Sequence, residues 1–438
     1  MVSLESYSSI VCFGASRGAI LAYILEHYFE KILCIVDNDE RKWGSKRELL
    51  VNGERRCVSI KSPDALRDFT ADYEIIITAY NHIDEIGNQL DSMGYEGRWV
   101  SARRHVSEIN TYEFRLYEKG IHPEKPVLRS LCLEVSSFCN CACIYCPFHG
   151  VQNLKGENKG LMDWEVIRSI AKNCKGISTI ETVTASIDGE IFTHPEWYEM
   201  VQYILDNTGI GKAVLYTNGM LLNEKNIDKL LNICANEVEL VVSIDGKSPE
   251  ENDTYRVGDD YSSIKENIYR LAEKRDKARA ALEIIITNSC MLTELEYGCS
   301  AQKEWPFSLP PPKFLRDDFP ELAIISHRAF AYKSKYRDDT FGNLKYRKMS
   351  WPDEFFNRCT NLYTDISVSW NGDIQICTCG AACMEAPIGN VKNDDLQEVF
   401  IGNSRVNEYR RMIFEGYKPR MCDGCPYIGL GDYWVLIS

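Results

Sequence analysis

The stretch Ser137-Phe138-Cys139-Asn140-Cys141-Ala142-Cys143-Ile144-Tyr145-Cys146-Pro147 holds four cysteines on one short loop, and Cys139, Cys143 and Cys146 have the spacing C-x3-C-x2-C. Iron–sulfur clusters are held by cysteine thiolates, so Cys139, Cys143 and Cys146 can bind three irons of a cubic 4Fe–4S cluster. Structural zinc usually takes four ligands in two close pairs, and no second pair lies nearby in the sequence. The loop therefore predicts a cluster with one iron left open, and Cys141 is not one of its ligands.

This loop, with the aromatic Tyr145 before its last cysteine, resembles the cluster motif of the radical SAM superfamily. In that family S-adenosylmethionine (SAM) chelates the open iron, and the reduced cluster cleaves SAM to a 5′-deoxyadenosyl radical. The resemblance implies SAM and a 4Fe–4S cluster as cofactors, and a flavodoxin- or ferredoxin-type electron donor. It assigns no catalytic residue of the chain.

Composition limits the class of protein. The 438 residues suggest two or three domains, and a net charge of −14 without a basic tract argues against a nucleic-acid binder. No apolar run approaches the length of a membrane span, and the first residues lack a secretory pattern, so a soluble, cytoplasmic protein is expected. Eighteen cysteines in a cytosolic chain favour metal binding over disulfides.

From Leu131 the sequence alternates apolar strands with amphipathic helices. Strands are expected near residues 131–135, 179–186, 213–217, 237–244, 282–287 and 322–325. Helices are expected near residues 163–173, 196–206, 224–235 and 262–275. Six βα units predict an α/β fold with a partial, TIM-like (β/α)6 barrel, whose active site lies at the carboxyl ends of the strands.

Polar motifs follow at those strand ends. The segment Asp188-Gly189-Glu190 resembles the Gly-Gly-Glu-Pro motif of the family, in which main-chain carbonyls bind the amino group of SAM, although Asp188 replaces the first glycine. Asn218 ends the third strand, as in many relatives. Alone, each of these residues is more often a turn former than a ligand. Their order behind the cluster loop favours SAM binding.

Three further residues complete the implied SAM site. Ser243, at the end of the fourth strand, matches a position where the family places a hydroxyl on the SAM ribose. Arg256 resembles the arginine that holds the SAM carboxylate, a role that suits its planar guanidinium. Tyr145, which precedes the last cluster cysteine, is the third residue assigned to SAM binding.

The first part of the chain reads as strand, glycine turn, helix and strand, with Gly14 and Gly18 in the turn and Asp37 after the second strand. This order is typical of a Rossmann-like βαβ unit, although the three-glycine fingerprint is incomplete. The turn and the helix start favour a phosphate, and Asp37 is placed to bind a ribose. The segment resembles the Rossmann-like domain of sugar acetyltransferases and methyltransferases, which is associated with nucleotide sugars. A scaffold or docking domain is the alternative, and NAD chemistry comes third.

A second cysteine set follows near the end of the sequence. Asn371-Gly372, between alternating apolar segments, predicts a hairpin with Cys359 and Cys377 on its flanks. With the C-x2-C pair at Cys422 and Cys425, four thiolates can bind a second 4Fe–4S cluster. This set resembles the SPASM and twitch caps of radical SAM enzymes, and the missing further cysteines favour the one-cluster twitch form. A four-cysteine zinc site is the alternative, and Cys379 and Cys383 compete as ligands.

The break at His122–Pro126 predicts a boundary, giving a Rossmann-like domain (1–124), a radical SAM barrel (125–350) and a SPASM/twitch cap (351–438). The expected function is hydrogen abstraction from a carbohydrate, free, nucleotide-linked or lipid-linked, followed by oxidation or epimerisation. Modification of a ribosomal peptide is the alternative within enzymes, and a non-catalytic iron–sulfur adaptor is the alternative outside them.

Overall fold

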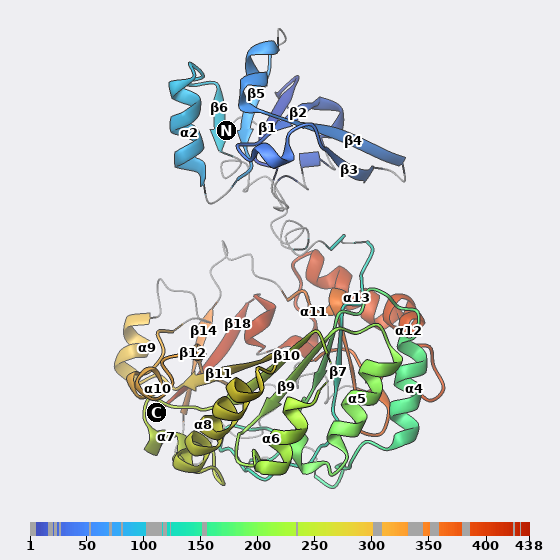
Figure 1. The fold of residues 1–438 in the computed structure, drawn as a ribbon, viewed down its shortest axis with the longest axis vertical. Helices are drawn as coiled ribbons and strands as arrows, with labels where there is room; N and C mark the ends of the chain where they lie inside the picture. The colour runs from blue at the N-terminus through green and yellow to red at the C-terminus, as the bar shows by residue number, and fades with distance from the viewer. Residues whose placement is uncertain are drawn as a thin grey trace. The chain divides into compact units, whose positions relative to one another are not determined.

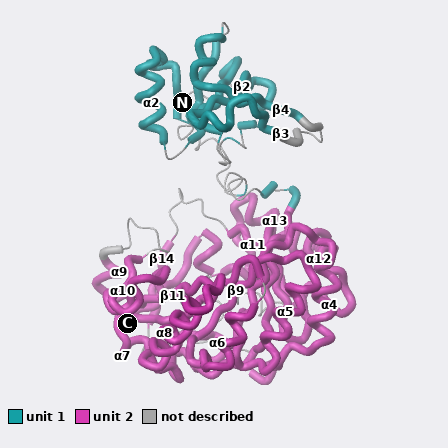
Figure 2. Tube along the Cα trace, viewed as in Figure 1, with its two compact units in different colours: residues 1–125 teal, residues 126–438 magenta. Residues whose placement is uncertain are grey.

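The computed structural model describes residues 6–15, 21, 24–25, 28–51, 54–69, 72–79, 82–101, 116, 121–122, 124–150, 156–233, 235–300, 309–331, 345–350, 359–378, 386–423, 425–429 and 431–438; no side chain is described at 48–51, 54–55, 299–300 or 331. The chain forms two compact units, residues 1–125 and 126–438 (Figure 2). The predicted further division of the second unit at residue 350 stays a prediction.

Unit 1 is built on a six-stranded sheet of order β3-β4-β2-β1-β5-β6 (Figure 1). The strands β4, β2, β1, β5 and β6 run parallel, and β3 pairs with β4 in the antiparallel sense. Their apolar runs are buried, as expected for a parallel sheet packed on both faces. The strands are β1 (Ile10–Phe13), β2 (Ile32–Val36), β3 (Lys46–Val51), β4 (Glu54–Lys61), β5 (Glu74–Ile77) and β6 (Trp99–Ser101).

Helix α2 (Ile83–Ser92) covers part of this sheet with Ile86 and Leu90, one helical turn apart and both buried. The predicted helix after the glycine turn includes Leu21, whose side chain is buried in the core of unit 1. The sequence also predicts a connecting helix over residues 106–120, and all of these except residue 116 lie outside the described residues. Short 3-10 helices are η2 (Phe29–Lys31), η3 (Glu40–Lys42) and η4 (Pro63–Asp68).

Unit 2 contains a nine-stranded sheet of order β12-β11-β10-β9-β8-β7-β15-β16-β17. Strands β7 to β12 are neighbours in chain order and run parallel, which confirms a mixed α/β fold with a parallel sheet. All six lie at or within a few residues of the predicted positions: β7 (Ser130–Leu133), β8 (Thr182–Ala185), β9 (Lys212–Thr217), β10 (Glu237–Ser243), β11 (Leu282–Cys290) and β12 (Ala323–Arg328).

Helices between these strands cover one face of the sheet, as α4, α5, α6 and α8 do in Figure 1. Helix α4 begins after its N-cap residue Asp163, whose carboxylate accepts a 2.8 Å hydrogen bond from the Val166 N–H. Its apolar face joins the main core. The helices are α4 (Trp164–Cys174), α5 (Trp197–Asn207), α6 (Glu224–Leu231), α7 (Pro249–Tyr255), α8 (Tyr261–Ala278), α9 (Glu294–Ser300) and α10 (Lys313–Asp318), with η7 (Ile191–Thr193).

The last part of the chain extends the same sheet. Strand β15 (Asp365–Val368) pairs parallel with β7, and β16 (Asp373–Gln375) pairs antiparallel with β15 through the predicted Asn371-Gly372 turn, where Gly372 has φ +92°. The other elements are β17 (Gly389–Asn390), α11 (Asn361–Thr364), α12 (Leu396–Gly402), α13 (Ser404–Phe414), η10 (Arg420–Cys422) and η11 (Pro426–Ile428).

A separate three-stranded sheet has the order β13-β18-β14, with β13 (Phe330–Ala331), β14 (Lys345–Ser350) and β18 (Asp432–Ile437). Strand β18 lies at the centre and pairs antiparallel with both neighbours. Within the described part of the chain, no helix combines the length and the apolar character that crossing a membrane requires.

Candidate active site

The cysteine loop that follows β7 is fixed by backbone hydrogen bonds to a segment far along the chain. Ala142 N–H donates to the Val257 carbonyl at 2.7 Å, and Ile144 N–H donates to the Tyr255 carbonyl at 2.9 Å. Gly258 has φ +102°, and a Cβ there would approach the Asn140 carbonyl oxygen to 3.0 Å. The segment after α7 therefore holds the loop in a defined shape at the carboxyl end of the sheet.

Two of the three predicted cluster thiols accept hydrogen bonds from backbone N–H groups. The Cys139 sulfur accepts an N–H hydrogen bond from Cys141 at 3.4 Å, and the Cys146 sulfur accepts one from His149, also at 3.4 Å. Hydrogen bonds from Cys141 lower the pKa of the Cys139 thiol to about 7, against the effect of burial. Cys143 is buried. This donor set fits a cluster that takes one thiolate for each of three irons.

The Cys141 thiol makes hydrogen bonds to other side chains. Its thiol donates to an oxygen of the Asp259 carboxylate at 2.6 Å, and it also accepts from the Asn218 amide at 3.3 Å. Asn218 donates at 2.8 Å to the side-chain oxygen of Asn140. Asn218, predicted as a SAM-site residue, thus ties the end of β9 to the cysteine loop, and it also lines the cavity described below.

The segment Asp188-Gly189-Glu190 lies directly against the same loop. A Cβ at Gly189 would meet the Ser136 carbonyl oxygen at 2.2 Å and the Phe138 carbonyl oxygen at 2.7 Å, so only glycine fits. The buried Glu190 carboxylate accepts from the Asn218 N–H at 2.8 Å and from the Thr217 hydroxyl at 2.9 Å. Burial raises the pKa of Glu190 to about 7. This segment joins β8, β9 and the cluster loop into one rigid corner.

Replacement of Gly189 by Ala is expected to destabilise this corner by about 1–3 kcal/mol, because the added methyl overlaps main-chain atoms that cannot rotate away. Iron content and the rate of SAM cleavage should fall together, measured beside urea unfolding under anaerobic conditions. Gly209→Ala is the matched control, since a Cβ there meets no heavy atom within 4 Å. Wild-type iron content and cleavage in Gly189→Ala would contradict this tight packing.

An ion-pair network joins Arg256 to residues that the sequence did not single out. Its Nη1 donates to the Asp245 carboxylate at 2.8 Å, and its Nε donates to Asp259 at 2.5 Å. The Tyr145 hydroxyl also donates to Asp245, and the Ser289 N–H does so at 2.8 Å. The signal that could have found Asp245 is its position before a glycine at the end of the same strand as Ser243. Arg256 therefore holds the cysteine loop through the two carboxylates, which accept hydrogen bonds from Tyr145 and Cys141 of that loop.

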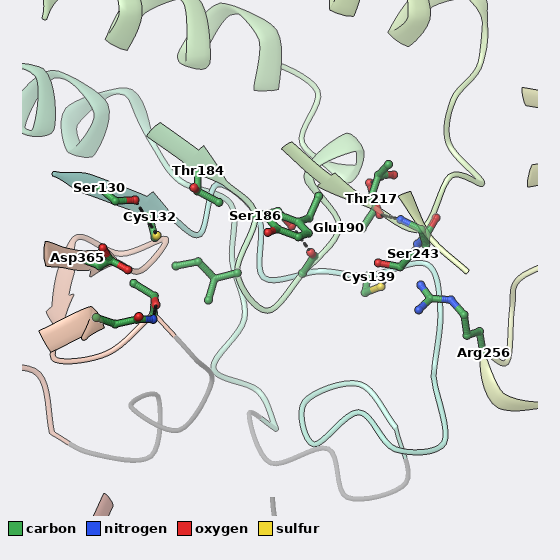
Figure 3. A pocket seen from close by; sticks show the side chains of 16 residues that line it. Ser130, Cys132, Cys139, Thr184, Ser186, Glu190, Thr217, Ser243, Arg256 and Asp365 are labelled. Atoms are coloured by element: carbon green, nitrogen blue, oxygen red, sulfur yellow. Dashed lines mark hydrogen bonds between the residues drawn. The ribbon is translucent and has the colours of Figure 1, made fainter. Parts of the chain in front are cut away.

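A cavity of 510 Å³ opens beside this network and extends to the last part of the chain (Figure 3). It contains most of the predicted SAM-site residues, namely Gly189, Glu190, Asn218, Ser243 and Arg256, together with Cys139. It also contains residues that the sequence did not predict: Ser130, Cys132, Thr184, Ser186, Ile187, Tyr216, Thr217, Asn361, Asp365 and Thr378.

A second cavity has a volume of 340 Å³, and Arg256 and Ile187 line both cavities. The thiols of Cys143 and Cys146 belong to this second cavity, with Tyr145 and Asp188. Its wall is rich in aromatic rings, because Phe148, His327, Phe330 and Tyr427 contribute to it. The three cluster cysteines thus line two cavities: Cys139 lines the polar one, and Cys143 and Cys146 line the aromatic one.

The second cysteine set also gathers in space. Cys422 and Cys425 are buried, and the pKa of the Cys425 thiol is raised by burial and by the neighbouring thiols of Cys422, Cys359 and Cys377. The four predicted ligands are thiols, and thiolates are the donors that hold an iron–sulfur cluster. Cys379 and Cys383, the competing ligands, lie outside the described residues.

Among the described residues, no three His, Cys, Asp or Glu side chains close around a point where a single metal ion could bind. A cubic cluster distributes its ligands differently, because each thiolate binds a separate iron.

The nucleotide site predicted in unit 1 is only partly described. A Cβ on Gly14, which has φ +117°, would lie 2.8 Å from the Ala79 Cβ, so glycine is required there for packing. The buried Asp37 carboxylate accepts from the Ala15 N–H at 2.5 Å and pairs with Lys42 at 3.2 Å. Gly18 lies outside the described residues. These contacts explain the turn, and the ribose contact of Asp37 stays a prediction.

Two protein-family profiles match the chain: the radical SAM superfamily over residues 133–287, and an iron–sulfur cluster-binding domain, SPASM, over residues 359–426. No curated protein matches the chain at a significant level. Similar solved structures include BtrN in complex with AdoMet and 2-DOIA (15% identity, 67% of this chain and 89% of that chain, TM-score 0.37). They also include Streptococcus suis SuiB bound to S-adenosylmethionine (14% identity, 80% of this chain and 82% of that chain, TM-score 0.39). A third is anSMEcpe with bound AdoMet and Cp18Cys peptide (18% identity, 69% of this chain and 88% of that chain, TM-score 0.37).

The two profile matches cover all seven predicted cluster cysteines. A radical SAM domain uses SAM and a 4Fe–4S cluster, and a SPASM domain binds auxiliary iron–sulfur clusters, so these are the cofactors of the chain. Residues 133–287 therefore form a radical SAM domain, and residues 359–426 form a SPASM iron–sulfur cluster-binding domain.

Proposed function

We propose that this enzyme abstracts a hydrogen atom from a C–H bond of a carbohydrate, free, nucleotide-linked or lipid-linked, and that oxidation or epimerisation of the sugar follows. The observation that carries the proposal is the 510 Å³ cavity, which extends from Cys139 to the last part of the chain and is lined mainly by hydroxyl, amide and carboxyl groups. Polar groups placed in a cavity orient a ligand through hydrogen bonds. A ring that carries several hydroxyl groups matches that lining.

With SAM and the cluster bound at Cys139, Cys143 and Cys146, the site supplies a 5′-deoxyadenosyl radical. The protein contributes orientation. Arg256 and Asp245 fix the cysteine loop, and Gly189 and Glu190 fix the edge of the sheet where SAM is expected. Ser243 and Asn218 line the same cavity within reach of that edge. We assign the four cysteines of the SPASM domain to one auxiliary cluster of the twitch type, in a cap beside a partial (β/α)6 barrel.

Whether epimerisation or oxidation follows depends on whether the substrate radical receives a hydrogen atom or loses an electron. Cys132 lines the cavity, and burial raises the pKa of its thiol to about 12, so the S–H bond is kept at neutral pH. A thiol there can give a hydrogen atom to a substrate carbon radical, and an electron from an external donor with a proton then restores it. This supports epimerisation. Oxidation instead requires that the substrate radical lose one electron and one proton.

We further assign unit 1 to the nucleotide part of a nucleotide-linked sugar, on the parallel sheet and the glycine turn at Gly14. Such binding, remote from the reacting carbon, would contribute to turnover. A scaffold or docking role for unit 1 is the alternative. The assigned division of the chain is 1–124, 125–350 and 351–438.

The test is anaerobic incubation of the reconstituted full-length enzyme with SAM, reductant and a panel of free and nucleotide-linked sugars in D₂O. We expect 5′-deoxyadenosine together with a sugar product. One deuterium on an inverted carbon would mark hydrogen return from an exchangeable thiol, and a mass lower by two hydrogens would mark oxidation. Modification of a precursor peptide with no sugar turnover would refute the carbohydrate assignment. If an iron-loaded protein forms no 5′-deoxyadenosine, the alternative function as a non-catalytic iron–sulfur adaptor is supported instead.

A further inference from the structure

The walls of the two cavities carry one permanent cation. Among the described residues that line them, Arg256 is the only lysine or arginine, and it lines both cavities. Figure 3 shows its guanidinium end directed toward Cys139, which lines the 510 Å³ cavity with it. SAM carries a carboxylate, and a guanidinium matches a carboxylate in charge and in planar geometry. Binding of that carboxylate therefore depends on how the guanidinium of Arg256 is oriented.

Two of the three guanidinium nitrogens are already engaged by buried carboxylates. Nη1 donates to Asp245 at 2.8 Å, and Nε donates to Asp259 at 2.5 Å. Within the described structure, Nη2 has no hydrogen-bond partner. The two carboxylates therefore decide which edge of the guanidinium is left for a ligand, and that edge is Nη2.

The Asp245 carboxylate is itself held by two further donors. One of its oxygens accepts from the Ser289 N–H on β11 at 2.8 Å, and the other accepts from the Tyr145 hydroxyl as well as from Arg256. Asp245 is buried, so rotation of its side chain would leave several buried donors without a partner. Its oxygens are therefore fixed points, against which the guanidinium is aligned.

The backbones of the two partners are linked as well. Asn252 on α7 is fully buried, its side-chain oxygen accepts from the Asp245 N–H at 2.9 Å, and its carbonyl accepts from the Arg256 N–H at 2.8 Å. The end of β10 and the end of α7 are thereby fixed relative to each other. This arrangement is formed before any ligand binds, so binding does not have to order the guanidinium.

The two carboxylates have different roles in this arrangement. Asp259 follows Arg256 by three residues on the same segment, and it accepts from the Cys141 thiol at 2.6 Å, so it ties Arg256 to the cysteine loop. Asp245 follows β10, and it ties Arg256 to the parallel sheet. The orientation of the guanidinium relative to the carboxyl end of the sheet is therefore set by Asp245.

We propose that Asp245 is a positioning residue for SAM, which holds the guanidinium of Arg256 so that its Nη2 edge binds the carboxylate of SAM. Asp245 acts through Arg256 and takes no part in bond breaking. The inference concerns the cofactor alone, so it is independent of the proposed carbohydrate function.

The experiment measures binding to the reconstituted full-length enzyme by anaerobic calorimetric titration, without reductant and without sugar, so that SAM is not cleaved. The probes are SAM and decarboxylated SAM, which keeps the sulfonium and the amino group. In Asp245→Asn the Kd for SAM should rise about tenfold, which corresponds to about 1.4 kcal/mol. The Kd for decarboxylated SAM should change by less than about twofold, because that ligand has no group for the Nη2 edge.

A double-mutant cycle tests whether Asp245 acts through Arg256. Arg256→Lys alone should weaken SAM binding, and Asp245→Asn added to it should have little further effect, because the group that it positions is already gone. Glu239→Gln is the matched control, since it removes an ion pair with Lys212 near the start of the same strand, β10, and it should behave as wild type. Iron content should stay near wild type in every variant.

Kinetics with reductant provide a second readout. In Asp245→Asn the KM for SAM should rise, while the rate of 5′-deoxyadenosine formation at saturating SAM should stay within about twofold of wild type. A carboxylate that only supports the fold would lower both the rate and the iron content.

Three results would overturn the proposal. Equal weakening of SAM and decarboxylated SAM in Asp245→Asn would show a general effect of the lost charge, since both ligands carry the cationic sulfonium. Additive losses in the cycle would show that Asp245 does not act through Arg256. A fall in iron content in Asp245→Asn would show that Asp245 supports only the cysteine loop.

Discussion

Simultaneous replacement of Cys139, Cys143 and Cys146 by Ala is expected to abolish SAM cleavage and to lower the iron content of the reconstituted protein from about eight to about four per chain. Removal of these thiolates leaves the cluster of the radical SAM domain without protein ligands. The loop itself should persist, because backbone hydrogen bonds from Ala142 and Ile144 to the segment after α7 hold it. Iron analysis and 5′-deoxyadenosine formation under strong reductant measure both effects.

Cys57→Ala is the control, because this thiol is exposed on β4 of unit 1 and belongs to neither cysteine set. It should keep about eight irons and the wild-type rate of SAM cleavage. Continued cleavage of SAM by the triple variant would refute the assignment of the radical site to this loop. A loss of all iron would show instead that the two cysteine sets do not load independently.

Replacement of both Cys422 and Cys425 by Ala should abolish product formation while 5′-deoxyadenosine is still formed. The two thiols belong to the SPASM domain and lie outside the loop at which SAM is expected. Their removal also takes charge and bulk from a buried site, so the iron content of the variant should fall to about four. The measurement is the ratio of product to 5′-deoxyadenosine, taken together with iron content.

Cys174→Ala serves as the control for the loss of a buried thiol, since Cys174 lies in the core on helix α4. It should keep the wild-type ratio of product to 5′-deoxyadenosine. Zinc rather than iron in the anaerobically purified wild-type SPASM domain would refute the auxiliary cluster. Equal loss of cleavage and product in the double variant would mean that this domain supports the fold of the whole site and has no separate role in turnover.

Much of the architecture was predictable because the signals are local. The alternation of apolar strands and amphipathic helices placed β7 to β12 and helices α4, α5, α6 and α8 within a few residues, and the Asn371-Gly372 turn placed the hairpin. Helix α7 was not predicted. The three cluster cysteines lie within one loop, so their spacing in the sequence is itself the signal that predicts a cluster. Asp163 likewise caps α4 from three residues away. In each case the interacting groups are close in the chain.

The Asp245–Arg256–Asp259 network is a different case. The sequence singled out Arg256 by its resemblance to a SAM ligand, but it gave no partner for the guanidinium. The structure shows two buried carboxylates beside it, one at the end of β10 and one before α8. A charge can be buried in this way only when it is paired, and the pairing depends on how the segment after α7 folds against the cysteine loop.

By itself, the sequence determined the parallel strand order, the loop that carries the first cluster, and the turn that begins the last hairpin, because periodicity and turn chemistry act over a few residues. Only the tertiary structure decided that β15 pairs with β7, more than two hundred residues away in the chain, and so brings Asp365 beside Ser130. It also decided that Cys132 faces a polar cavity. Both outcomes depend on which strand edge accepts β15, and no local pattern encodes that choice, since it is set by the packing of the whole sheet.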